Sequence, residues 1–246
     1  MKKLYATFTA SLFLAGIAQA ALLTDIDGAA ASVDYTGEDF SGQTVGTELA
    51  PNSTDNWGRS DIFTNADFSS AEFNLSGNQS FLGTTITGAD FTGATFNITT
   101  WLSGTTQRFN TFRNATGSGA SFEDTAWNIT LSSTDAFDNS EFFDGTGTLS
   151  AMDFSGATFT FDITDSDVAT QTAAVDVIIG NLGDSASYFD DDFVTNNFVA
   201  FGYASGALLE ADLVSNGWQV IPEPGSYALL AGLLGMSYVM VRRRRA

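Results

Sequence analysis

Two consecutive five-residue units decide the fold of this chain and read Ala66-Asp67-Phe68-Ser69-Ser70 and Ala71-Glu72-Phe73-Asn74-Leu75. In each unit, an alanine stands two places before a phenylalanine, with an acidic residue between them. A third unit of the same form is Ala89-Asp90-Phe91-Thr92-Gly93. A period of five is neither the 3.6-residue period of an α-helix nor the two-residue period of a strand. The units therefore predict a coil with a repeat length of its own.

Large apolar residues carry this spacing through most of residues 61–160. The grid comprises Phe63, Phe68, Phe73, Phe81, Ile86, Phe91, Phe96, Trp101, Phe112, Phe122, Trp127, Phe137, Phe142, Phe154 and Phe159, with an earlier trace at Tyr35, Phe40 and Val45. The five-residue spacing is interrupted at residues 75–81, 101–112 and 142–154. Similar side chains one coil apart can stack, and alanine fits where a larger side chain would clash. We therefore predict an interior of stacked rings and alanines, with the polar positions facing water.

These units resemble the pentapeptide-repeat family, whose repeat is roughly Ala-Asp-Phe/Leu followed by two polar residues. The resemblance implies a mainly β fold, an irregular right-handed quadrilateral β-helix over residues 61–164. Residues 21–60 would cap or lead into it. The alternative is a β-sandwich whose turn-rich strands happen to show fives.

Residues 165–221 differ in composition and are predicted to form a small C-terminal cap and linker. Val175-Asp176-Val177-Ile178-Ile179-Gly180 has the pattern of a short buried strand. Phe193, Val194, Phe198, Val199 and Phe201 fit one face of a strand or irregular segment. Residues 207–214 have helical composition, with Ser205 as a possible cap and Gly217 beyond the end.

The first 20 residues predict a secretory signal peptide. Lys2 and Lys3 supply its positive start, and residues 4–17 are mostly apolar and uncharged. The small residues Ala18 and Ala20 form a signal-peptidase site, so cleavage would leave Ala21 as the first residue.

The C-terminal segment, residues 222–246, has three ordered parts: Pro222-Glu223-Pro224, the apolar run 226–241, and the tail Arg242-Arg243-Arg244-Arg245. As a helix, the run would be about 24 Å long, which is short for a bilayer core of about 30 Å. We predict a transmembrane helix over 226–241. The arginines should stay on the cytoplasmic side, which leaves the preceding body outside the inner membrane.

This order of parts resembles the PEP-CTERM sorting signal. The resemblance implies recognition by an exosortase-like processing enzyme, which would cut near Pro222-Glu223-Pro224 and discard the anchor. The protein would then be anchored only transiently in the inner membrane before it reaches the cell surface or the extracellular space. Such proteins are typical of bacteria that make an extracellular polysaccharide matrix.

The body, residues 21–221, carries 28 acidic and three basic residues, a net charge of −25. This charge repels nucleic acid, so no nucleic-acid partner is predicted. The chain has no histidine or cysteine, and the body has no lysine. Histidine-based triads, cysteine nucleophiles and zinc sites of His or Cys are therefore excluded. An oxygen-ligated calcium site remains possible in principle, with Asp190, Asp191 and Asp192 as candidate metal ligands and Asp162, Asp165 and Asp167 as a second cluster. Neither cluster matches an EF-hand loop. We predict no metal and no cofactor.

The favoured function is a non-enzymatic surface or extracellular-matrix protein, with extracellular polysaccharide as a possible partner. The alternative is a carbohydrate-active enzyme or polysaccharide-binding module that uses surface carboxylates. A glycosidase needs two carboxyl groups at a set separation, and nothing in the sequence singles out such a pair. Trp57, Trp101, Trp127 and Trp218 could stack on sugars if exposed, but Trp101 and Trp127 fall on the five-residue grid and are expected in the core.

Overall fold

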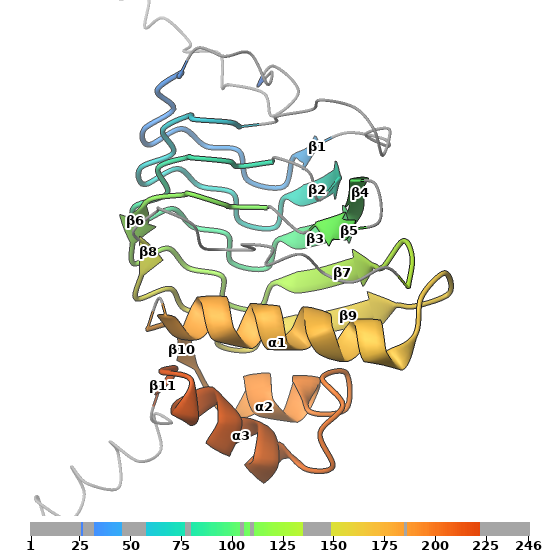
Figure 1. Ribbon diagram of the computed structural model, residues 1–246. Coiled ribbons are helices and arrows are strands. Elements are labelled where there is room, and N and C mark those ends of the chain that lie inside the picture. The colour runs from blue at the N-terminus through green and yellow to red at the C-terminus, as the bar shows by residue number, and fades with distance from the viewer. Residues whose placement is uncertain are drawn as a thin grey trace, which may run out of the picture.

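The computed structural model describes residue 26 and residues 32–45, 58–76, 80–103, 106–108, 111–134, 149–184 and 186–221 (Figure 1). Its strands are β1 Thr44–Val45, β2 Glu72–Ser76, β3 Thr95–Thr99, β4 Trp101–Ser103, β5 Thr106–Arg108, β6 Gly117–Ser118, β7 Ala126–Thr130, β8 Leu149–Ser150, β9 Thr158–Asp162, β10 Tyr188–Phe189 and β11 Gln219–Val220. Its helices are α1 Val168–Asp184, α2 Asp191–Asn197 and α3 Gly206–Ser215.

A five-stranded parallel sheet, in the order β1-β2-β3-β7-β9, organises the molecule. The chain passes through it in successive layers, at 34–45, 62–76, 85–99, 116–130 and 149–162. Isolated parallel bridges join the layers on the other sides, as in the series Asp39, Asp67, Asp90, Ser121, Asp153 and Tyr188. The three helices lie together at the end of the stack beyond β9 (Figure 1).

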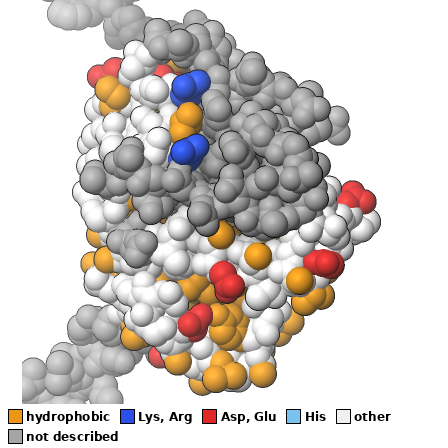
Figure 2. Space-filling model, viewed as in Figure 1, with side chains coloured by type: hydrophobic (Ala, Val, Ile, Leu, Met, Phe, Trp, Pro, Cys, Tyr) orange, Lys and Arg blue, Asp and Glu red, His pale blue; other side chains and the backbone are white. Residues whose placement is uncertain are grey.

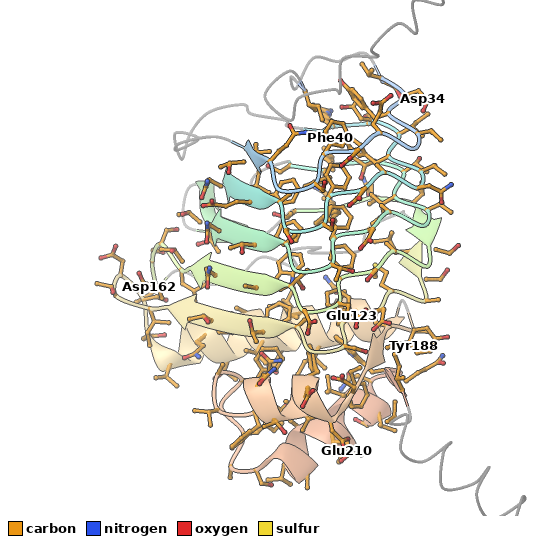
Figure 3. The ribbon with its side chains drawn as sticks, turned by 180° about the vertical axis from the view of Figure 1, so that it is seen from behind. Asp34, Phe40, Glu123, Asp162, Tyr188 and Glu210 are labelled. Atoms are coloured by element: carbon orange, nitrogen blue, oxygen red, sulfur yellow. The ribbon has the colours of Figure 1, made fainter. Side chains whose placement is uncertain are left out.

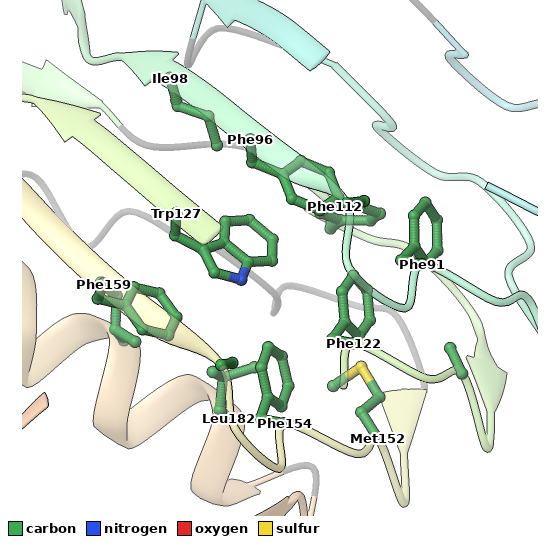
Figure 4. Packing of buried hydrophobic residues seen from close by; sticks show 14 of the residues in the cluster. Phe91, Phe96, Ile98, Phe112, Phe122, Trp127, Met152, Phe154, Phe159 and Leu182 are labelled. Carbon is green, nitrogen blue, oxygen red and sulfur yellow. The ribbon is translucent and has the colours of Figure 1, made fainter. Parts of the chain in front are cut away.

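The predicted ring interior is confirmed for the grid phenylalanines that the structure describes, while Phe137 and Phe142 lie outside the described residues. Phe40, Phe68, Phe91, Phe122 and Phe154 form one column, with neighbouring ring centroids 4.8–5.0 Å apart and nearly parallel planes. Strand register builds a second column from Phe73, Phe96, Trp127 and Phe159. Figure 4 shows Phe96, Trp127 and Phe159 of this column. Parallel strands lie about 4.8 Å apart, which sets the ring spacing. Both columns are buried, as are the alanines two places before the rings.

A β-turn explains the five-residue period. The amide of Ala71 donates to the carbonyl of Phe68 at 3.0 Å, which closes a four-residue turn. Ser70, the third residue of this turn, has φ +58°. The same turn follows Phe91, where Gly93 has φ +68° and Ala94 donates to Phe91 at 2.9 Å. Each ring of the first column is thus followed by a turn whose left-handed third residue favours Gly, Asn or a small polar residue. The rings of the second column are instead followed by strand residues.

An aspartate precedes four of the five rings in the first column and stabilises the turn, while Ser121 precedes Phe122. Asp67 Oδ1 accepts the amide N–H of Ser69 at 2.8 Å, and Asp90 Oδ1 accepts that of Thr92 at 2.9 Å. Asp153 Oδ1 accepts both the amide and the hydroxyl of Ser155. The alanine–acid–phenylalanine pattern therefore has a local cause, because each residue serves the packing or the turn.

Asparagines form a ladder on the outward side of the sheet. Asn97 Nδ2 donates to Asn74 Oδ1 at 2.8 Å, and Asn128 Nδ2 donates to Asn97 Oδ1 at 2.8 Å. These residues are directly opposite in register. The ladder ties β2, β3 and β7 together from outside while the rings pack inside.

The predicted fold class, a mainly β right-handed quadrilateral β-helix, is wrong. The structure is a mixed α/β fold, with the five-stranded parallel sheet and three helices in its described residues. The error arose in the C-terminal part, where Val175–Gly180, predicted as a strand, lies inside α1. Val175, Ile178, Ile179 and Leu182 are buried at helical spacing and pack into the core. Phe193 and Val194 likewise belong to a helix, α2.

The helix predicted at 207–214 is confirmed as α3, with Ser205 at its N-cap position. Among the residues that the structure describes, no helix is both long and apolar enough to cross a membrane. The predicted signal helix, residues 1–20, and the predicted transmembrane helix, residues 226–241, lie outside these residues.

Candidate functional site: the acidic face around Glu123

The candidate site is an acidic face made by Asp67, Asp90, Glu123, Asp124, Asp153 and Asp190. Parallel bridges set Asp67 beside Asp90, and Ser121 between Asp90 and Asp153. Glu123 and Asp124 belong to the turn after Phe122, in which Thr125 donates to the carbonyl of Phe122. Figure 3 shows Glu123 near the helical end of the stack. Residues from four layers and the cap thus meet on one surface.

Asp190 joins this face because it anchors the cap to the last layer. Its Oδ1 accepts the amide N–H of Phe193 at 2.8 Å, which caps α2, and that of Gly156 at 3.0 Å. Asp191 and Asp192 are exposed in the first turn of α2, where the helix dipole favours negative charge. The three candidate metal ligands therefore serve the start of a helix.

Glu123 is the carboxyl most affected by this setting. Partial burial raises its pKa above the usual range, and the charges of Asp153, Asp124, Asp190 and Asp90 raise it further. Hydrogen bonds act oppositely elsewhere on the surface. The Thr36 hydroxyl lowers the pKa of Asp34, and the Thr164 hydroxyl lowers that of Asp162. The backbone amide of Thr170 lowers the pKa of Asp167 at the start of α1.

No group of three or more acidic residues in the described part of the chain is arranged to hold a metal ion. Each aspartate of the stacked series turns one oxygen inward to its own loop, which separates the carboxylates rather than converging them. Asp162 and Asp167, from the second predicted cluster, bond Thr164 and Thr170 in the same local way. The face can therefore attract cations loosely through its charge.

The two tryptophans whose side chains the structure describes, Trp127 and Trp218, are buried and cannot stack on a sugar. Trp127 is buried between Phe96 and Phe159, as predicted from its place on the grid. Trp218 is also buried, and its Nε1 donates to the carbonyl of Ile179 at 2.9 Å. Trp57 and the side chain of Trp101 lie outside the described parts of the chain.

The predicted processing sites also lie outside the described residues. They are Ala18, Ala20 and Ala21 at the signal-peptidase site, Pro222, Glu223 and Pro224 in the sorting motif, and Arg242, Arg243, Arg244 and Arg245 in the basic tail. The sequence did not single out Glu123, because its charged neighbours come from other layers, Asp153 at 30 and Asp90 at 33 residues away, and from Asp190 of the cap. Its one local signal is Asp124 beside it.

Comparison with known proteins found no matching family model, no matching curated protein and no matching solved structure.

We expect Glu123→Gln to raise the thermal unfolding midpoint at pH 7. A carboxyl whose pKa is raised on folding costs stability above that pKa and nothing well below its unfolded value, near 4.3. The gain should therefore shrink as the pH falls toward 4. Scanning calorimetry at pH 4 and pH 7 checks this. Glu38→Gln, at an exposed site in the first layer, removes the same charge. Equal shifts in both variants at both pH values would contradict the expectation.

Proposed function

We propose that this chain is an exported, non-enzymatic surface or extracellular-matrix protein that is sorted through its C-terminal segment. The observation that carries the proposal is the order of its two ends. A positively charged, apolar start with a small-residue cleavage site is followed, some 200 residues later, by Pro222-Glu223-Pro224, an apolar run and four arginines. Between them lies a body with a net charge of −25.

The described body is consistent with a scaffold role. The stacked phenylalanine rings are buried in the interior. Aspartates such as Asp67 and Asp190 accept backbone hydrogen bonds in a turn and at a helix start. Stacked layers joined by backbone hydrogen bonds make a rigid unit, and a strongly anionic surface resists aggregation. The same charge can hold divalent cations between the protein and an acidic polysaccharide. The partners proposed are an exosortase-like enzyme, the inner membrane before processing, and extracellular polysaccharide afterwards.

The test is mass spectrometry of the protein recovered from the surface fraction of its host. We expect the signal peptide and the residues beyond the Pro222-Glu223-Pro224 motif to be missing. Replacing these three residues by alanine should leave the basic tail in place and the protein in the membrane fraction. Gln219→Ala, at an exposed position just upstream, should be processed normally. Recovery of the full chain, with residues 1–20, from the cytosol would overturn the proposal.

A second candidate is a carbohydrate-active enzyme, and the raised pKa of Glu123 is the observation that favours it. An upward shift of its pKa is the direction that a general acid acting on a glycosidic oxygen requires. Reducing-end release from host polysaccharide would be measured for the natural protein, for Glu123→Gln and for Glu38→Gln. Turnover that Glu123→Gln alone abolishes would replace the scaffold proposal with this one.

A further inference from the structure

Helix α3 has two apolar faces, and only one of them packs against the other residues that the structure describes. Leu209 and Leu213 are fully buried against the rest of the cap. On the other side, Ala207, Ala211 and Val214 are exposed at the i, i+4, i+7 spacing of a helical stripe, with Leu208 beside them. Leu208 is 55% exposed and Val214 50% exposed. These four residues are the outer face of α3.

Acidic residues border this outer face on both sides. At 3.6 residues per turn, Glu210 falls beside Val214 on one side and Asp212 beside Leu208 on the other. Glu210 is exposed, and Asp212 accepts a hydrogen bond from the Tyr203 hydroxyl. The result is an amphipathic surface with an apolar centre and negatively charged margins.

The outer face lies at the end of the molecule from which the chain leaves. Strand β11 follows α3 after three residues and contacts it. β11 pairs with β10, and the amide of Ile221 donates to Phe189 at 2.7 Å, so the exit point is held firmly. Val220 is 42% exposed beside it. Figure 2 shows apolar side chains gathered at this end of the molecule, where Figure 1 places α2 and α3.

The apolar run 226–241 begins only five residues after Ile221. Five residues span at most about 18 Å. With that run inserted in a bilayer, α3 cannot move more than this short tether from the lipid surface. The lipid interface is therefore present at high effective concentration beside a helix that has an uncovered apolar stripe.

We propose that the outer face of α3 rests on the membrane interface while the chain is anchored. This rests on the export and anchoring proposed above. An interfacial helix lies in the plane of the membrane, with its apolar face at the boundary between headgroups and acyl chains. The preferred lipid has zwitterionic headgroups, because the acidic margins repel an anionic surface. Residues 165–221 contain no Lys or Arg that could bind anionic headgroups. The cap then faces the membrane, and the first layer points away from it.

The test uses the full chain reconstituted in phosphatidylcholine vesicles. Because the chain has no cysteine, Leu208→Cys and Glu38→Cys each give one labelling site for an environment-sensitive fluorophore. Glu38 is exposed in the first layer, far from the cap. We expect a blue-shifted emission at Leu208→Cys, with about twofold or stronger quenching by nitroxide-bearing lipid than at Glu38→Cys. Adding phosphatidylglycerol should weaken both effects.

The outcomes separate this proposal from the one it rests on. Chains that float with the vesicles but give the same water-like emission at both positions overturn the docking of α3, while anchoring stands. Chains that do not float at all overturn anchoring. A blue shift at Leu208→Cys that needs no lipid and grows with protein concentration assigns the outer face to a second copy of the chain, which also overturns the proposal.

Discussion

Trp127→Ala is expected to lower the free energy of unfolding by about 3–5 kcal/mol, the usual cost of removing a large buried aromatic side chain. Trp127 is fully buried in β7, with ring centroids 4.1 Å from Phe96 and 5.6 Å from Phe159. Its Nε1 donates to Thr125 Oγ1 at 2.9 Å. Removing the indole removes the ring contacts to Phe96 and Phe159 in the layers on both sides. The buried Thr125 hydroxyl also loses the Nε1–H donor. Urea unfolding followed by circular dichroism measures the change.

Two further variants separate the parts of this effect. Trp127→Phe keeps a stacked ring and loses the hydrogen bond, so we expect a smaller loss than for alanine. Asn128→Ala, the next residue of β7, removes an exposed side chain from the asparagine ladder and should cost about 1 kcal/mol or less. If Trp127→Ala and Asn128→Ala cost the same, the ring columns do not carry the stability of the stack.

Asn197→Leu is expected to release α2 from the last layer. Asn197 is fully buried and bonds three backbone groups: its Oδ1 accepts the amide of Phe159, and its Nδ2 donates to the carbonyls of Ala157 and Phe193, all at 2.7 Å. Leucine has a similar size but no polar atoms, so these groups stay buried and unpaired. Each such group costs about 1–3 kcal/mol, and the two in the last layer together about 2–6 kcal/mol.

Hydrogen exchange distinguishes local release from general weakening. We expect the Phe159 amide to lose most of its protection in Asn197→Leu while the Phe96 amide, two strands away in β3, keeps more of its own. Asn196→Ala, at the exposed neighbouring position with a longer 3.3 Å bond to Gly156, is the matched control and should change little. Full protection at Phe159 in the leucine variant would mean that Asn197 does not hold the cap.

The ring interior was predictable because its cause is local. A ring at position 68 is followed by a turn through Ser69 and Ser70 to Ala71, so one five-residue unit contains the inward residue, the turn and the small filler. The third residue of the turn has a left-handed conformation, and the glycine or small polar residue that this conformation favours can be recognised in the sequence. The extent of α3 was predictable for the same reason, from composition and its flanking Ser205 and Gly217.

The wrong strand assignment at residues 175–180 has a physical reason. Short apolar runs do not distinguish a buried strand from a buried helix, and Val175–Gly180 was assigned to the wrong one. Asp167, whose side chain accepts the amide of Thr170 at 2.8 Å, marks the start of α1. Asp190 marks the start of α2 in the same way. Both aspartates were considered as metal ligands, although a carboxylate three residues before a helical amide is a helix-start signal.

The sequence by itself determined which side chains lie inside the stack, where the chain turns, and the charge of the surface, because these follow from residues close together in the chain. Only the tertiary structure decided which carboxylates surround Glu123, which face of α3 stays uncovered, and that residues 168–184 and 191–197 form helices at the end of the stack. Those outcomes depend on the register between layers whose paired residues are 23 to 35 positions apart in the chain. Because the connections between layers differ in length, the sequence does not show which residues pair.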